Sequence, residues 1–406
     1  DMVCAQAEDC PKDMTREGLD LATDGRYVWA EKTSLGGDDC IAVAAAFAIL
    51  ADNSLSHPPL EVVITVDEET GMDGAVALDC SDLKGRRLLN LDSEEEGVFT
   101  VSCAGGLRAD CFVPAAKEPL TDEACFAVSI GGLKGGHSGA EIDKGRGSGN
   151  DLISRVLYSA MERLGTLRIA DLRGGQFDNV ICTRCDAVVA VPAGKAEDFA
   201  AFIREFDGIL KNEYAATDGG VTLTCAAADA DAAYSAEDSS RLLHVLLTLP
   251  QGVEVMSADF PGLVQTSLNL GVMTACGDGL HFSFSIRSSV ATQKELLLQR
   301  VRAIVEYTGG GTVSTRGDYP AWQYARQSPL RDTVMASYKQ ITGQDGVIMA
   351  THGGLECGLL INKMPGLDAV SLGPELHDIH SPRERLGVDS VKRMYALVCE
   401  VLKNCR

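Results

Sequence analysis

The apolar run from Leu60 to Val66 (LEVVITV) most constrains what this chain can fold into. It is continuous and rich in β-branched residues, which is typical of a strand buried on both faces of a parallel sheet. It ends abruptly in three acids, Asp67-Glu68-Glu69. A second short apolar run, Leu88–Leu91, also ends in acids, from Asp92 onward. We therefore predict a parallel α/β sheet here, with carboxylates at the ends of its strands.

The apolar patterning changes character twice along the chain. Its middle part alternates strand and helix patterns that predict an α+β insertion of two sub-lobes, each with an antiparallel sheet. After the insertion the α/β pattern returns, with a helix that begins at Ser328 as N-cap and has Pro329 in its first turn. We predict a three-layer α/β domain, residues 1–105 and 324–406, interrupted by an α+β domain over residues 106–323.

The charge balance excludes some partners. The 406 residues contain 36 Lys+Arg and 58 Asp+Glu, a net charge of −22, which repels nucleic acid and anionic membrane surfaces. The longest apolar run, Cys40–Ala51, is shorter than the ~20 residues of a membrane span, and no signal peptide opens the chain. The 14 cysteines show no disulfide-framework spacing, which favours free thiols in a reducing cytoplasm.

The acidic strand ends indicate a metal site. Besides the two clusters above, Asp38 lies in a glycine turn before a helix, and the segment Glu375–Glu384 contains His377 and His380. Carboxylates that meet at one sheet edge repel each other unless a cation neutralises them. Asp, Glu and His suit Zn²⁺ or a related ion, and a shared carboxylate can bridge two ions ~3.5–4 Å apart.

Alternatives remain at this level. The acids can be solvated loop residues, and either His377 or His380 can be the ligand. The adjacent pair Glu68 and Glu69 can divide the labour, because one can bind metal while the other holds a water as general base. The loop Gly136–Ala140 lacks the last glycine of a nucleophile elbow, which argues against a serine hydrolase.

Several strings together resemble one family of enzymes. They are LGGDDC, TVDEETG, LLNLDSEEEG, GGLKGGHSG and HSPRE, and they resemble the M20 metallopeptidases over essentially the whole chain. The strings CAGG, GRGSGND and HGGLECG are most similar to its aminoacyl-histidine dipeptidase branch. The resemblance implies a cytoplasmic dipeptidase for Xaa-His or a broader range of dipeptides. It also implies two Zn²⁺ ions (Co²⁺ or Mn²⁺ being alternatives) and a homodimer formed through an α+β lid domain.

The resemblance implies a role for each residue of the metal centre. Asp38 would bridge the two ions, Glu69 and His380 would bind the second ion, and Asp92 would bind the first. Glu68 would act as general base and then general acid.

The first residues resemble the end of the family's HxDMV string. Asp1 would orient a zinc-binding histidine two residues upstream, which is absent from this sequence. We therefore expect a truncated chain that binds the first ion weakly and has low activity.

The resemblance also implies substrate-binding residues in the lid domain. His137 would stabilise the oxyanion, often in the partner subunit's site, Asn179 would contact the substrate, and Arg287 would hold the peptide's terminal carboxylate. Outside the lid, Glu356 would line the substrate pocket, with a structural role at a helix start as the alternative.

Two other functions stay open. The chain can be a non-catalytic homologue that binds metal or peptide, or an M20 deacylase or tripeptidase that cleaves a different amide. The strings specific to the dipeptidase branch argue against the deacylase and tripeptidase readings.

Overall fold

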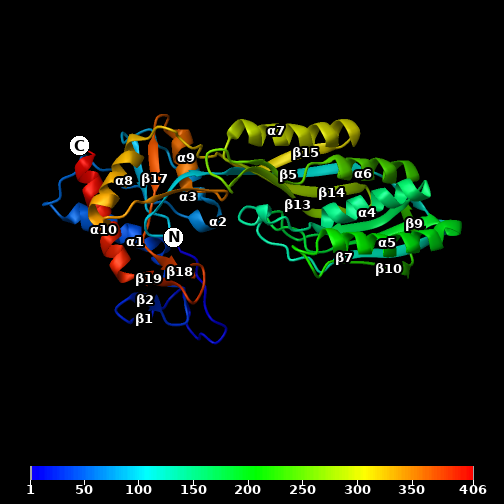
Figure 1. The fold of residues 1–406 in the computed structure, drawn as a ribbon, viewed down its shortest axis with the longest axis horizontal. Helices are drawn as coiled ribbons and strands as arrows, with labels where there is room; N and C mark the ends of the chain where they lie inside the picture. The colour runs from blue at the N-terminus through cyan, green and yellow to red at the C-terminus, as the bar shows by residue number, and fades with distance from the viewer. Residues whose placement is uncertain (1, 406) are drawn as a thin grey trace. The chain divides into compact units, whose positions relative to one another are not determined.

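The computed structural model describes residues 2–405 and divides the chain into two compact units (Figure 1). The first unit combines both ends of the chain, up to Cys103 and again from Trp322. The second unit comprises Ala104–Ala321. The boundaries expected at residues 105 and 323 differ from those at 103 and 321 by two residues.

A mixed four-stranded sheet forms the centre of the first unit. Its order is β16-β4-β17-β3, with parallel pairs β16–β4 and β17–β3 and an antiparallel contact between β17 and β4. The bounds are β3 Arg87–Asn90, β4 Val98–Cys103, β16 Val347–Thr351 and β17 Asp368–Ser371. Helices pack against this sheet, so the α/β class is confirmed for this unit.

The helices of the first unit bury a compact apolar core. Side chains from α1, α8 and α10 pack together with Val370 and Leu372. Strand β17 runs between α8 and α9 (Figure 1). Ser328 caps α8 by accepting a hydrogen bond from the backbone nitrogen of Arg331, as its sequence predicts. The bounds are α1 Gly37–Ala51, α2 Glu68–Gly71, α3 Asp73–Ala77, α8 Pro329–Thr342, α9 Glu356–Lys363 and α10 Val388–Asn404.

The predicted strand over residues 60–66 is wrong. This segment is not part of a sheet, and no strand among residues 2–405 pairs with it. Its side chains still alternate, because Val63 and Thr65 are partly buried whereas Ile64 and Val66 are 59% and 63% exposed. An apolar run favours extended backbone, but a strand also needs a neighbour to receive its hydrogen bonds.

A second small sheet in the first unit joins distant parts of the sequence. It is antiparallel, with the order β1-β2-β19-β18. The bounds are β1 Leu21–Thr23, β2 Tyr27–Ala30, β18 Leu376–His377 and β19 Arg385–Gly387. The loop between β18 and β19 contains His380, so this sheet fixes both ends of that loop.

The second unit contains one nine-stranded antiparallel sheet, not two sub-lobes. Its order is β10-β7-β9-β8-β13-β14-β5-β15, and β12 pairs with β13. The pairing of β13 with β8, at Met273 with Gly174, joins the two halves into one sheet. The bounds are β5 Gly105–Pro114, β7 Glu123–Gly131, β8 Arg168–Gly174, β9 Cys185–Pro192, β10 Thr222–Ala228, β12 Gly252–Met256, β13 Val264–Ala275, β14 Gly279–Ser288 and β15 Thr312–Tyr319.

Four long helices pack against this sheet and bury a large apolar core. They are α4 Gly149–Leu164, α5 Ala196–Glu213, α6 Ala236–Thr248 and α7 Ala291–Arg302. The helical path of α7 continues as a π-helical segment, Ala303–Thr308. Short 3₁₀ turns cover Ile142–Lys144 and Ala193–Lys195.

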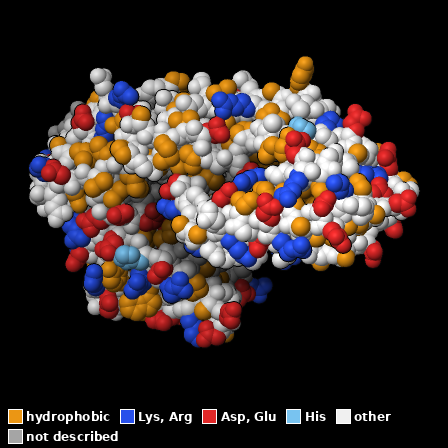
Figure 2. All heavy atoms as spheres, turned by 45° about the vertical axis from the view of Figure 1, so that its right-hand side comes forward, with side chains coloured by type: hydrophobic (Ala, Val, Ile, Leu, Met, Phe, Trp, Pro, Cys, Tyr) orange, Lys and Arg blue, Asp and Glu red, His pale blue; other side chains and the backbone are white. Residues whose placement is uncertain are grey.

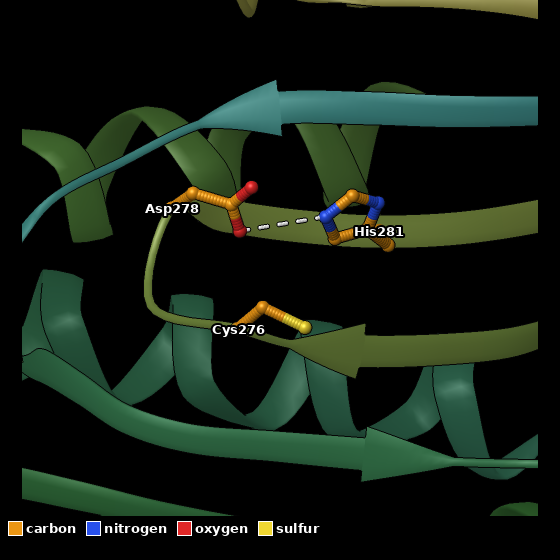
Figure 3. Close-up of side chains that lie close together, drawn as sticks. All are labelled: Cys276, Asp278 and His281. Carbon is orange, nitrogen blue, oxygen red and sulfur yellow. Dashed lines mark ion pairs between the residues drawn. The ribbon is translucent and has the colours of Figure 1, made fainter.

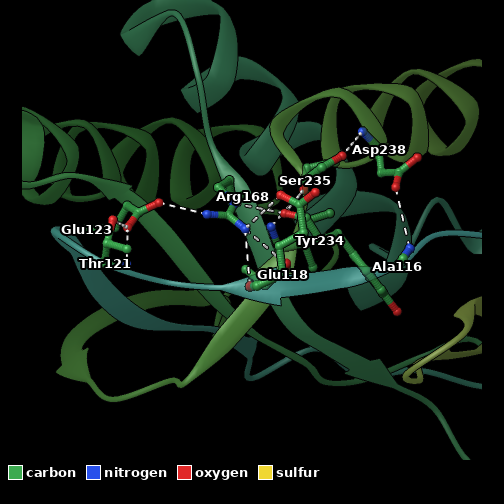
Figure 4. A network of polar contacts seen from close by, with 11 residues as sticks. Ala116, Glu118, Thr121, Glu123, Arg168, Tyr234, Ser235 and Asp238 are labelled. Carbon is green, nitrogen blue, oxygen red and sulfur yellow. Dashed lines mark hydrogen bonds and ion pairs between the residues drawn. The ribbon is translucent and has the colours of Figure 1, made fainter.

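A two-stranded ribbon, β6 Lys117–Pro119 with β11 Ala232–Tyr234, is tied to the large sheet by Arg168 (Figure 4). The Arg168 guanidinium donates to Glu123 Oε1 at 2.8 Å and to the backbone oxygens of Tyr234 and Ala233 at 3.0 and 3.1 Å. The backbone at Tyr234 is therefore held in place.

The hydropathy of the helices, the cysteines and the surface charges complete the description of the fold. Within residues 2–405, no helix combines the length and apolar character needed to cross a membrane. All 14 cysteines lie in this range, and each is a free thiol. Basic and acidic side chains lie interspersed on the face shown in Figure 2.

Candidate metal centre and substrate-binding residues

Asp38, Glu69 and His380 come together in the first unit. Nε2 of His380 lies 3.1 Å from Asp38 Oδ2 and 2.9 Å from Glu69 Oε2. One ligand atom from each of the three residues lies within 4.8 Å of the other two. Two carboxylates and an imidazole at this spacing fit the donor set of Zn²⁺ or a related divalent ion.

Glu384 holds the turn that carries Asp38. Glu384 is 2% exposed, and its carboxylate accepts hydrogen bonds from the backbone nitrogens of Leu35 at 2.7 Å, Gly36 at 2.9 Å and Asp38 at 3.3 Å. These bonds satisfy donors that precede the regular part of α1. Our sequence analysis missed this positioning role, although Glu384 is the last residue of the HSPRE string that singles out His380.

The structure separates the two candidate histidines of this region. His380 faces the carboxylates of Asp38 and Glu69, and its backbone has a φ of 59°. His377 instead contacts Glu375 Oε1 at 2.8 Å and the hydroxyl of Tyr27 at 3.5 Å. Residues with positive φ are sparse and cluster at functional sites, which agrees with the position of His380.

Three further acids crowd the same region. Burial, together with nearby Glu69, Glu356 and Asp38, raises the pKa of Glu68 to about 7. Burial, with Glu68 and the two aspartates of α1, raises the pKa of Asp92 to about 9.

Asp39 behaves in the same way, since burial and the charge of Asp38 raise its pKa to about 8. Carboxyl groups that are buried close together hold their protons, and a divalent cation would remove that penalty. The charges in this region therefore fit a bound cation.

These acids line one cavity in the first unit. The cavity has a volume of about 300 Å³, and its polar lining includes Asp38, Glu68, Glu69, Asp92 and Glu356. Apolar side chains from residues 60–64, 88–91 and α1 form much of the rest of its wall.

Glu356 lies at the first residue of α9 and is buried. Its Oε1 accepts a hydrogen bond from Thr65 Oγ1 at 2.7 Å. Glu356 therefore lies both at the start of a helix and in the wall of the cavity, so its position fits both roles that were considered from the sequence. Asp1, the remaining predicted residue of the metal centre, lies outside the described residues.

His137, Asn179 and Arg287 belong to the second unit. Nδ1 of His137 accepts hydrogen bonds from the backbone nitrogens of Gly139 at 3.2 Å and Ala140 at 3.1 Å. The imidazole proton must then sit on Nε2, which leaves that nitrogen able to donate. The pKa of His137 is lowered by burial and by the nearby charge of Arg287, so the neutral ring is favoured.

Arg287 is a buried cation without a carboxylate partner among residues 2–405. It is 6% exposed, its Nη1 donates to the Tyr319 hydroxyl at 3.0 Å, and its Nε has no hydrogen-bond partner. The backbone oxygen of Asn179 accepts from Ser138, which fixes the Asn179 segment beside the His137 loop. A buried guanidinium with an unused donor suits an anionic ligand.

Comparisons with known proteins assign the family. The sequence profile of peptidase family M20/M25/M40 matches residues 23–404. The chain belongs to this family, and the expected family is confirmed.

Two similar proteins support this assignment, and a third shares the fold alone. The chain is 36% identical over 405 residues to the cytosol non-specific dipeptidase of Escherichia coli. The alignment covers 99% of this chain and 83% of that protein. The crystal structure of aminoacylhistidine dipeptidase from Vibrio alginolyticus is similar, with a TM-score of 0.93 and 33% identity over 100% of this chain and 82% of that one. Aminopeptidase PepT from Bacillus cereus, with a TM-score of 0.51 and 15% identity, shares the fold over 96% of this chain and 77% of that one.

Proposed function

We propose that the chain is a metal-dependent dipeptidase with two Zn²⁺ ions, for which Co²⁺ or Mn²⁺ can substitute. The observation that carries the proposal is the grouping of Asp38, Glu69 and His380, whose two carboxylates line one cavity together with Glu68. The similarity to two enzymes named as dipeptidases over 99–100% of the chain supports it.

The proposed roles in the metal centre are those that the resemblance to the family implies, and the grouping of Asp38, Glu69 and His380 supports them. Asp38 would be shared between the two ions, Glu69 and His380 would hold one of them, and Asp92 would hold the other. Bound metal supplies Lewis-acid polarisation of the scissile carbonyl. Glu68 takes a proton from the attacking water and returns it to the leaving amine, a task that suits a carboxyl with a pKa near 7.

The proposed roles in the second unit concern the substrate. His137 donates from Nε2 to the developing oxyanion, and Arg287 binds the terminal carboxylate of the peptide. Asn179, a residue of the second unit, contacts the peptide. Glu356, in the wall of the cavity of the first unit, also has a substrate-binding role. Because Arg287 would require a terminal carboxylate close to the scissile bond, dipeptides are favoured over long peptides.

Finer features of the proposal are Xaa-His substrates among a broader range of dipeptides, a homodimer formed through the second unit, and action in the cytoplasm. A panel of Xaa-His dipeptides, other dipeptides, tripeptides and N-acyl amino acids, assayed with Zn²⁺ or Co²⁺ in excess, tests the substrate class. Dipeptides should be cleaved fastest, and faster cleavage of N-acyl amino acids would favour a deacylase instead.

Replacement of the proposed base tests the mechanism. Glu68→Gln should lower kcat by about 10²–10⁴-fold, which is the usual contribution of a general base. Glu8→Gln, an exposed acid of the same unit, is the matched control and should leave kcat unchanged. A Glu68→Gln variant that keeps full activity would exclude the proposed mechanism.

A further inference from the structure

Cys276, Asp278 and His281 form a second cluster of metal-binding side chains, in the second unit and apart from the residues used above (Figure 3). One ligand atom from each lies within 4.8 Å of the other two, and His281 Nε2 is 3.5 Å from Asp278 Oδ1. We propose that these three residues bind a divalent transition-metal ion of the Zn²⁺ or Co²⁺ type at the turn between β13 and β14.

The hairpin places the thiol and the imidazole on one face. Thr274 pairs with His281, and Ala275 pairs with Leu280. Cys276 follows Thr274 by two residues, so its side chain leaves the same face of the hairpin as that of His281. Asp278 lies in the turn itself, and Figure 3 shows its carboxylate directed toward the imidazole.

The backbone of the turn is fixed without any metal. The hydroxyl of Tyr234 lies 2.6 Å from the backbone oxygen of Cys276 and 2.7 Å from that of Gly279. The backbone oxygen of Asp278 accepts a hydrogen bond from Ala115 at 3.0 Å. Tyr234 is completely buried, and Arg168 holds its backbone (Figure 4). The ligand side chains therefore start from a rigid frame, which lowers the entropic cost of binding an ion.

The side chains themselves can adjust. The side chains of Asp278 and His281 are 70% and 49% exposed, so small rotations can bring their atoms to the ~2.0–2.3 Å that zinc requires. The His281 ring stacks on Phe112 with 4.7 Å between ring centroids, which limits its orientation. Solvent can supply the fourth ligand at this exposed position.

The donor set selects the class of ion. A thiolate, an imidazole and a carboxylate suit Zn²⁺ and Co²⁺, whereas Mg²⁺ and Ca²⁺ prefer oxygen ligands alone. The net charge of −22 also concentrates cations around the chain.

Cobalt absorption distinguishes this site from the Asp38 centre. The three residues that meet there supply only oxygen and nitrogen, whereas ligation by Cys276 produces a thiolate-to-Co²⁺ charge-transfer band in the near ultraviolet. We expect this band when the full chain is titrated with Co²⁺, and we expect Zn²⁺ to remove it. The band should be lost in Cys276→Ser and retained in Cys40→Ser, an exposed thiol next to the Asp38 turn. His281→Ala should weaken Co²⁺ binding by about tenfold or more.

A second measurement uses the unmodified chain, so it does not depend on the folding of a variant. Alkylation of each cysteine is followed by mass spectrometry with and without Zn²⁺. Zinc should slow alkylation of Cys276 and leave that of Cys4 unchanged. A missing charge-transfer band, a band that persists in Cys276→Ser, or equal alkylation of Cys276 with and without Zn²⁺ would overturn the proposal.

Discussion

Nε2 of His380 lies 2.9 Å from Glu69 Oε2, although 311 residues separate the two in the sequence. The loop between β18 and β19 carries the histidine, and the single turn α2 carries the glutamate. The imidazole of His380 lies within 3.1 Å of both the Asp38 and the Glu69 carboxylates, which is the position expected of a third metal ligand.

The role of His380 is tested by metal affinity. His380→Ala should weaken binding of one Zn²⁺ by at least about 10–100-fold, the range already seen when groups that only support a ligand are lost. His377→Ala is the control, because His377 contacts Glu375 and Tyr27 instead. Calorimetric titration with Zn²⁺ measures both, and a larger loss in His377→Ala would assign the ligand to that residue.

The role of Glu384 is tested by stability. Glu384→Ala leaves three backbone N–H groups without their carboxylate acceptor, which should lower the free energy of unfolding by about 3 kcal/mol. Glu384→Gln keeps one acceptor oxygen and should recover part of that loss. Urea unfolding with and without Zn²⁺ gives both values. If Glu384→Ala changed neither stability nor metal affinity, Glu384 would not be a positioning residue.

The role of Arg287 is tested with matched substrates. Arg287→Ala should raise KM for a dipeptide by about 10–100-fold, because a charge-assisted contact contributes about 1.5–3 kcal/mol. The same change should have little effect on the C-terminal amide of that dipeptide, which lacks the carboxylate. Equal losses with both substrates would show that Arg287 does not recognise the carboxylate.

The buried acids predict how the stability of the metal-free chain depends on pH. Burial raises the pKa of Asp92 to about 9 and that of Glu68 to about 7, whereas unfolded carboxyls titrate near pH 4. Between about pH 4 and pH 9 the folded state therefore holds more protons than the unfolded state, and stability falls as pH rises.

Urea unfolding of the metal-free chain at pH 5, 7 and 9 measures this slope. Asp92→Asn removes one of the titrating groups and should flatten it. Binding of Zn²⁺ at pH 7 should also release protons, which calorimetry in buffers of different ionisation enthalpy detects. Stability that increased from pH 5 to pH 9 would contradict the raised pKa values of these buried acids.

Local signals were enough to identify several parts of this fold. The N-cap at Ser328 and the interruption of one domain by another were predicted from sequence, since caps and apolar periodicity depend on neighbouring residues. The acids after Val66 and Leu91 were interpreted as a metal site because they directly follow apolar runs in the sequence. The structure brings Asp38, Glu69 and His380 together as that interpretation requires.

Non-local pairing accounts for what sequence analysis missed. The β8–β13 contact that unites the large sheet joins Gly174 to Met273, and no local pattern indicates it. The bonds from Glu384 to the Asp38 turn span more than 340 residues. The relation of His281 to Cys276 appears only when the register of the hairpin is known.

Metal dependence of dipeptide hydrolysis tests the central claim most directly. The chain is stripped of metal with a chelator, and hydrolysis of an Xaa-His dipeptide is measured before and after excess Zn²⁺ is restored, for the unaltered chain and for Asp38→Asn. The account predicts no hydrolysis without metal, recovery on addition of Zn²⁺, and no recovery in Asp38→Asn. Hydrolysis that continued in the stripped chain, or that Zn²⁺ restored equally in Asp38→Asn, would contradict it.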